Sequence, residues 1–146
     1  MVGIPGSGKT TVAKSQFAHA LRASFDDVRL MLTGKHFQPR LEPIVEAVGL
    51  AIVEALFASA PKKGYDVLLD ATNLTRAKRR RYIAMAIQYG LVPVAVFIKC
   101  DLDIALERNR QRPGVVPAQV VKRMFKNLEP PATEEGFAEV IQVDTG

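Results

Sequence analysis

A glycine-rich octapeptide near the start of the chain constrains the fold more than any other feature. Residues Gly3-Ile4-Pro5-Gly6-Ser7-Gly8-Lys9-Thr10 match the pattern G-x-x-x-x-G-K-[ST]. Glycines at these positions let successive backbone N–H groups turn inward, so that a concave anion site forms at the N-terminus of the helix that follows. The pattern therefore predicts a phosphate-binding loop that runs from a buried strand into a helix.

The chemistry of a triphosphate assigns roles within this loop. We expect Lys9 to reach the β- and γ-phosphates of ATP, and the hydroxyl of Thr10 to bind Mg²⁺. The alternative is a glycine-rich turn that precedes a helix with an exposed lysine. The predicted ATP-binding residues of the loop are Gly3, Pro5, Gly6, Ser7, Gly8, Lys9, Thr10 and Thr11.

The strand before the loop is short. Only Met1 and Val2 precede Gly3, whereas natural strands usually have about five residues. Either residues upstream are missing from this chain or the first strand is a stub. We favour missing residues, because a sheet split at its centre would lose much of its core.

Composition excludes several other classes of protein. A length of 146 residues corresponds to one domain, and 48% hydrophobic with 24% charged residues is typical of a globular protein rather than a disordered one. The longest nearly apolar stretch, Ala47 to Ala60, is too short for a bilayer and contains Glu54, so no membrane partner is expected. One cysteine, Cys100, fits a cytoplasmic location. A net charge of +5 suggests phosphate-bearing partners.

Helical and strand patterns alternate along the chain. A helix from Thr11 to about Leu21, a polar break at Arg22–Asp27, a short segment Val28–Leu32 and a loop from Thr33 to Arg40 come first. The remaining predicted elements are helix 41–57, strand 66–70, helix 76–89 capped by Thr75, strand 92–99, helix 102–111, a helix opened by Pro117, and strand 140–143. This alternation predicts one α/β domain, residues 1–146, with a parallel sheet covered by helices on both faces.

Three further segments follow the loop in a recognisable order. They are Asp26-Asp27-Val28-Arg29, then Leu68 to Leu74, then Cys100-Asp101 with Glu107 to Pro113 and Val116-Pro117. In this order they resemble the kinase domain of phage-type polynucleotide 5′-hydroxyl kinases, within a wider set of small P-loop phosphotransferases. The resemblance implies a P-loop NTPase fold with three α/β/α layers and kinase-like strand order 2-3-1-4-5, with the first strand largely missing here.

The resemblance also implies an activity, which is transfer of the γ-phosphoryl group of ATP, with Mg²⁺, to the 5′-hydroxyl of a nucleic acid. Asp26 is then the general base and Arg29 holds the acceptor phosphate; alternatively, Asp26 only caps a short helix and Arg29 is exposed. Asp70, at the carboxyl end of a strand, would hold a Mg²⁺-bound water or fix Arg29 by an ion pair, unless it merely ends the strand.

A cationic lid completes the expected site. Residues 108–117 resemble the family's lid, in which Arg112 would stabilise the charge of the transferred group and Arg108 would assist from the same helix face. The alternative is a solvated basic helix. Lys9, Asp26, Arg29 and Arg112 are therefore the predicted catalytic residues, Arg108 and Arg112 also contact ATP, and Thr10 and Asp70 are the predicted Mg²⁺ ligands.

The acceptor is left open by the sequence. Five basic residues lie between Arg76 and Arg81 and either contact a nucleic-acid backbone or form a solvated face. Two alternatives to a polynucleotide kinase remain, namely a kinase of a small-molecule alcohol or nucleoside and an ATP-binding or ATPase module without kinase activity. Oligomeric state is not predicted.

Overall fold

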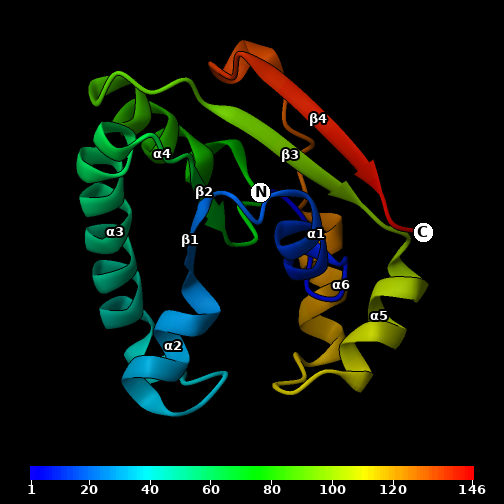
Figure 1. Cartoon of the computed structure of the whole chain (residues 1–146). Coiled ribbons are helices and arrows are strands. Elements are labelled where there is room, and N and C mark those ends of the chain that lie inside the picture. Colours follow the sequence, from blue (N-terminus) through cyan, green and yellow to red (C-terminus); the bar gives the residue numbers. More distant parts are fainter. The chain divides into compact units, whose positions relative to one another are not determined.

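A computed structural model describes all 146 residues (Figure 1). These residues form two compact units. The first unit consists of Met1–Thr11 together with Thr72–Gly146, and the second consists of Val12–Ala71. The first helix, α1 (Lys9–Gln16), begins in the first unit and continues into the second. Each unit is described separately.

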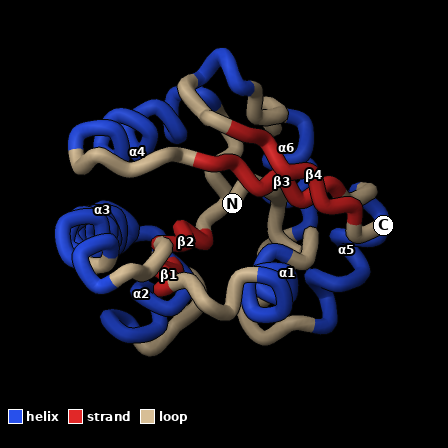
Figure 2. The backbone as a smooth tube through the Cα atoms, turned by 45° about the horizontal axis from the view of Figure 1, so that its top comes forward, coloured by secondary structure: helices blue, strands red, loops and turns tan.

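The first unit contains a parallel pair of strands. Strands β3 (Val94–Lys99) and β4 (Glu139–Asp144) lie side by side in parallel, with Val94 opposite Glu139 and Lys99 opposite Asp144 (Figure 2). Val2 adds a single parallel bridge to Phe97 on the other edge of β3. The segment before the phosphate loop therefore contributes one bridge to the sheet, and the expectation that upstream residues are missing stays a prediction. Val2 itself is buried.

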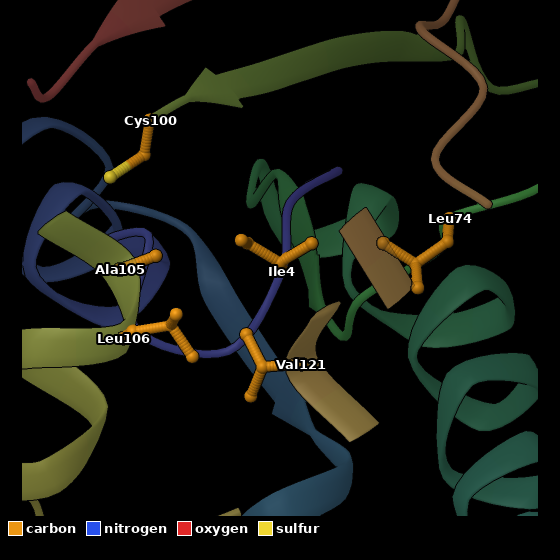
Figure 3. Packing of buried hydrophobic residues seen from close by; sticks show 6 residues of the cluster. All are labelled: Ile4, Leu74, Cys100, Ala105, Leu106 and Val121. Atoms are coloured by element: carbon orange, nitrogen blue, oxygen red, sulfur yellow. The ribbon is translucent and has the colours of Figure 1, made fainter. Parts of the chain in front are cut away.

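Three complete helices belong to this unit: α4 (Arg76–Gln88), α5 (Leu102–Gln111) and α6 (Ala118–Lys126). The predicted cap of α4 is confirmed, since the hydroxyl of Thr75 accepts a hydrogen bond from the Lys78 N–H. The core beneath the helices is a buried cluster to which the loop residue Ile4 contributes (Figure 3). The cluster consists of Ile4, Leu74, Cys100, Ala105, Leu106 and Val121.

The second unit pairs β1 (Leu21–Ser24) with β2 (Val67–Asp70) in parallel and adds α2 (Phe25–Thr33) and α3 (Glu42–Ser59). Gly49 of α3 allows α2 to pack closely, because a Cβ atom at this position would lie 2.3 Å from the ring of Phe25. In β1 and β2, Ser24 stands opposite Asp70, so both strands end at the same level.

The second unit contains a long apolar helical segment. It extends beyond Ala47 to Ala60, the stretch that was judged too short to cross a bilayer. Residues Pro39–Lys63 form a 25-residue helical segment with a mean hydropathy of 1.7 in its best window, which by length and composition alone would suffice to cross a bilayer. Within the unit this helix packs against α2, β1 and β2, and 28% of that window is buried. Core helices of soluble proteins pass the same test, so the finding is weak evidence for a membrane span.

Two predictions of local structure were wrong. The presumed polar break at Arg22–Asp27 is strand β1 followed by the start of α2, and α1 ends at Gln16 rather than near Leu21. The charge of Arg22 suggested a break, but Asp70 on the neighbouring strand neutralises it. The hydroxyl of Ser24 then caps α2 by accepting from the Asp27 N–H at 3.2 Å, which no apolar pattern signals.

The other predicted elements are confirmed to within a few residues. The parallel pairs β1–β2 and Val2–β3–β4 are the neighbours that strand order 2-3-1-4-5 requires within each unit, counting the segment with Val2 as the first strand.

Candidate active site

The phosphate loop has the backbone geometry that its glycines predict. Gly6 and Gly8 have φ angles of +80° and +93°, in the left-handed region that glycine enters without a steric penalty. Helix α1 begins at Lys9, directly after the second of these glycines, so the backbone N–H groups of its first turn directly follow the loop. The Lys9 ammonium donates to the Ile4 carbonyl at 2.8 Å and so closes the loop on itself.

Gly6 is required for a second reason, namely its contact with α5. A Cβ atom on Gly6 would lie 2.1 Å from the carbonyl oxygen of Ala105 and 3.2 Å from the backbone nitrogen of Asn109. Both atoms belong to the backbone, which cannot move aside as a flexible side chain could. The phosphate loop is therefore seated directly on the backbone of α5.

Thr145 braces the loop from the end of β4. Its hydroxyl donates to the Ser7 carbonyl at 2.7 Å, and its own N–H donates to the Lys99 carbonyl at 3.0 Å. Sequence reasoning missed this residue, for which the only signal is a hydroxyl side chain directly after the last strand. The loop is thus fixed to both strands of its unit.

The residues of this loop fit a bound triphosphate. Inward-turning N–H groups at a helix start favour anions, and the lysine supplies a positive charge. The hydroxyl of Ser7 is buried and has no hydrogen-bond partner. A buried polar atom without a hydrogen-bond partner costs folding free energy, and such atoms are often found at functional sites.

The predicted lid residues do not share one helix face. Arg112 is the residue after α5, with φ −89° and ψ 150°, so it lies outside the helix that carries Arg108. Arg108 donates to the Thr145 carbonyl at 2.7 Å, which ties it to the residue that braces the loop. The prediction of a common face was wrong because the helix ends one residue before Arg112.

Asp26 and Arg29 interact directly, as neighbours on one turn of α2. The Arg29 guanidinium donates from Nη1 to the Asp26 carboxylate at 2.6 Å, and from Nε and Nη2 to both oxygens of Glu42 at 2.6 and 3.1 Å. Glu42, at the start of α3, was not among the predicted site residues. Arg29 therefore orients Asp26 while Glu42 holds the other edge of its guanidinium.

Asp70 pairs with Arg22, and the suggested ion pair between Asp70 and Arg29 was wrong. Arg22 Nε donates to the buried Asp70 carboxylate at 2.9 Å, and Arg22 Nη1 donates to Asp27 at 3.1 Å. Register explains the partner, because Arg22 lies on β1 beside the strand that ends in Asp70. Arg22 and Asp70 are 48 residues apart in the sequence, so no local sequence pattern indicates that they pair.

Both guanidinium groups are stabilised in their charged form. Burial by itself would lower the pKa of Arg22 and Arg29, but hydrogen bonds and the charges of their carboxylate partners outweigh it, and both pKa values rise. The largest contribution that raises the pKa comes from the hydrogen bond with Asp70 for Arg22 and from the hydrogen bonds with Glu42 for Arg29.

One member of the predicted basic run is a core residue. Arg79 is 2% exposed and forms a two-point ion pair with Glu135, and it also donates to the carbonyls of Asn73 and Glu129. With its charge and its donors engaged inside the protein, it does not contribute to a basic surface. Its neighbours Arg76, Lys78, Arg80 and Arg81 are exposed.

The predicted residues thus fall into two sets. The loop, Arg108 and Arg112 belong to the first unit, whereas Asp26, Arg29 and Asp70 belong to the second. Because the predicted Mg²⁺ ligands Thr10 and Asp70 lie in different units, the Mg²⁺ site stays a prediction.

Comparison with known proteins places the chain in a family. The AAA domain family matches residues 1–131. The chain belongs to this family. Among curated relatives, L-seryl-tRNA(Sec) kinase of Methanococcus maripaludis is 26% identical over 140 residues, covering 92% of the chain and 53% of the relative. The human protein of that name is 30% identical over 69 residues, or 47% of the chain and 20% of the relative.

A solved structure shows the same fold. A gluconokinase from Sinorhizobium meliloti matches 98% of the chain and 79% of its own with a TM-score of 0.60 and 23% identity. The chain therefore has the predicted P-loop kinase-like α/β fold with parallel strands. The matches support the wider set of small P-loop kinases rather than the phage polynucleotide kinases in particular. The chain spans about half, or a fifth, of the length of the curated relatives it matches.

Proposed function

We propose that this chain is an ATP-dependent phosphotransferase that moves the γ-phosphoryl group to a hydroxyl carried on a nucleic acid, with the 5′-hydroxyl of a polynucleotide as the first candidate. The observation that carries the proposal is the phosphate loop, with its left-handed Gly6 and Gly8 and with α1 beginning at Lys9. The kinase names of the relatives agree with it.

Each predicted catalytic residue has a task in such a transfer. ATP supplies the γ-phosphoryl group, and Mg²⁺ offsets the negative charge of the phosphates. Asp26, oriented by Arg29, accepts the hydroxyl proton as the oxygen–phosphorus bond forms and the bond to the leaving ADP breaks. Lys9 and Arg112 stabilise the charge on the transferred group.

Two basic helices support a nucleic acid as the acceptor. Neither α4 nor α6 contains an acidic residue, and both present exposed cations. The end of α6 adjoins the start of α4, because the Glu129 carboxylate accepts from the Arg76 N–H and the Glu129 N–H donates to the Leu74 carbonyl. The exposed cations are Arg76, Lys78, Arg80, Arg81, Lys122, Arg123 and Lys126.

The basic start of α4 is unfavourable for the helix itself. Positive side chains in a first turn oppose the helix dipole. A phosphate backbone on this surface would relieve that repulsion, and its binding would weaken steeply with salt.

A panel of acceptors tests the proposal. Labelled ATP is incubated with 5′-hydroxyl DNA and RNA, with seryl-tRNA, and with gluconate, and the label is followed to acceptor or to water. Label on a nucleic acid, with binding that falls as salt rises, supports the proposal. Label on gluconate alone favours the small-alcohol alternative, for which the solved gluconokinase is the precedent. Label in water alone indicates an ATPase and overturns the kinase assignment.

A further inference from the structure

Asn109, in the last turn of α5, fastens the loop that carries Arg112 within the predicted lid. Its side chain is buried, with the residue 2% exposed. The amide nitrogen Nδ2 donates to the Val116 carbonyl at 2.7 Å, and the amide oxygen Oδ1 accepts from the Val116 N–H at 3.1 Å. These two bonds close residues 110–115, which include Arg112, into a loop with fixed ends.

The amide at this position is chemically specific. Asparagine is a poor helix former, so helix stability does not explain it. A buried amide is costly unless its donor and its acceptor are both engaged, and here Val116 engages both. Val116 itself packs against the hydrophobic cluster that contains Ile4 and Ala105. The clamp therefore joins the loop to the core at one defined point.

The backbone of the same residue touches the phosphate loop. The position that a Cβ atom would take on Gly6 is 3.2 Å from the Asn109 nitrogen, so no side chain separates the two segments. Through its backbone Asn109 supports the phosphate loop, and through its side chain it holds the segment with Arg112. Asn109 therefore connects the phosphate loop with the segment that carries Arg112, and the distance between these two matters for transfer of the phosphoryl group.

We propose that Asn109 is a positioning residue, which sets the place of Arg112 relative to the phosphate loop during phosphoryl transfer. The inference rests on the proposed function. Charge stabilisation by a guanidinium depends steeply on its position, because a misplacement of about 1 Å can cost on the order of 100-fold in rate. Outer-shell groups that orient a functional side chain typically account for about 10- to 100-fold.

A double-mutant cycle tests the proposal. Asn109→Ala is expected to lower kcat about 10- to 100-fold while the KM for ATP changes by less than about threefold. In an Arg112→Ala background the same substitution is expected to have almost no further effect, because the residue it positions is gone. Losses that multiply in the double variant would show a general structural effect and overturn the proposal. Asn127→Ala, at the exposed end of α6, is the matched control and retains wild-type rates.

Hydrogen exchange provides a readout that needs no activity. Asn109→Ala is expected to speed exchange at the Val116 amide and in residues 112–116, and to leave β3 unchanged. Asn109→Asp keeps an acceptor for the Val116 N–H but sets a buried carboxylate oxygen against the Val116 carbonyl, so it is expected to give at least as large an increase. Faster exchange throughout the first unit, or none at Val116, contradicts the clamp. A wild-type chain that transfers no phosphoryl group overturns the proposed function, and the exchange data then decide the clamp alone.

Discussion

The two sets of candidate site residues are held in place by different kinds of structure. In the first unit, backbone geometry forms the phosphate loop, with two left-handed glycines, a seat on α5 and a brace from Thr145. In the second unit, ion pairs between side chains hold the acidic residues, through Arg29 and Arg22. The first set should therefore be sensitive to added atoms, and the second to lost charge.

Gly6→Ala should have the largest effect of the variants that probe this difference. The added methyl group meets a backbone oxygen and the residue keeps a positive φ, so the loop must shift. We expect ATP affinity to fall about 100-fold or more, measured by calorimetry or by fluorescent nucleotide displacement. Gly64→Ala, also at positive φ but with open space around it, should leave ATP affinity unchanged and lose only about 1 kcal/mol of stability. Equal ATP affinities in the two variants would contradict the seat on α5.

The ion pair of Arg29 with Glu42 should give an intermediate effect. Arg29→Gln, Glu42→Gln and the double variant form a cycle, and we expect a coupling free energy of about 1–2 kcal/mol from urea unfolding, because the pair is partly buried and two-pronged. Arg40→Gln, at an exposed neighbouring position, is the control and should change stability by less than about 0.5 kcal/mol. A coupling near zero would mean that Glu42 does not hold Arg29 in solution.

Lowering the pH should give the smallest of these effects. It should reduce the unfolding free energy of the first unit through protonation of Glu135. Burial would raise the pKa of Glu135, but hydrogen bonds from Arg79 and the Ala132 N–H, with the positive charges of Arg79 and Arg76, lower it below the usual 4.5. Since the folded-state pKa is the lower one, its contribution to stability is present above pH 4.5 and is lost as the pH falls through the folded-state pKa.

The unfolding free energy of the wild type should therefore decrease below this pH more steeply than that of Glu135→Gln. Hydrogen exchange should place the difference in α4, where Arg79 lies. Identical pH profiles for the two proteins would contradict the assigned pair.

The sequence predicted the phosphate loop of the first unit better than the ion pairs of the second unit. The backbone geometry of the phosphate loop was predictable, because its glycines and lysine lie within one short segment of sequence, from Gly3 to Lys9. The partners of Arg22 and Arg29 were not, because they lie 48 and 13 residues away and depend on strand register and helix packing. Arg79 was interpreted as surface charge because its partner Glu135 is 56 residues distant.

The central proposal is that the phosphate loop binds the triphosphate and that Asp26 is the general base. Comparison of Asp26→Asn with its neighbour Asp27→Asn tests it most directly, by measuring ATP affinity and phosphoryl transfer for both. The account predicts that Asp26→Asn binds ATP as the wild type does but transfers about 10²- to 10⁴-fold more slowly, and that Asp27→Asn loses far less. Wild-type transfer by Asp26→Asn, or loss of its ATP binding, would contradict the account.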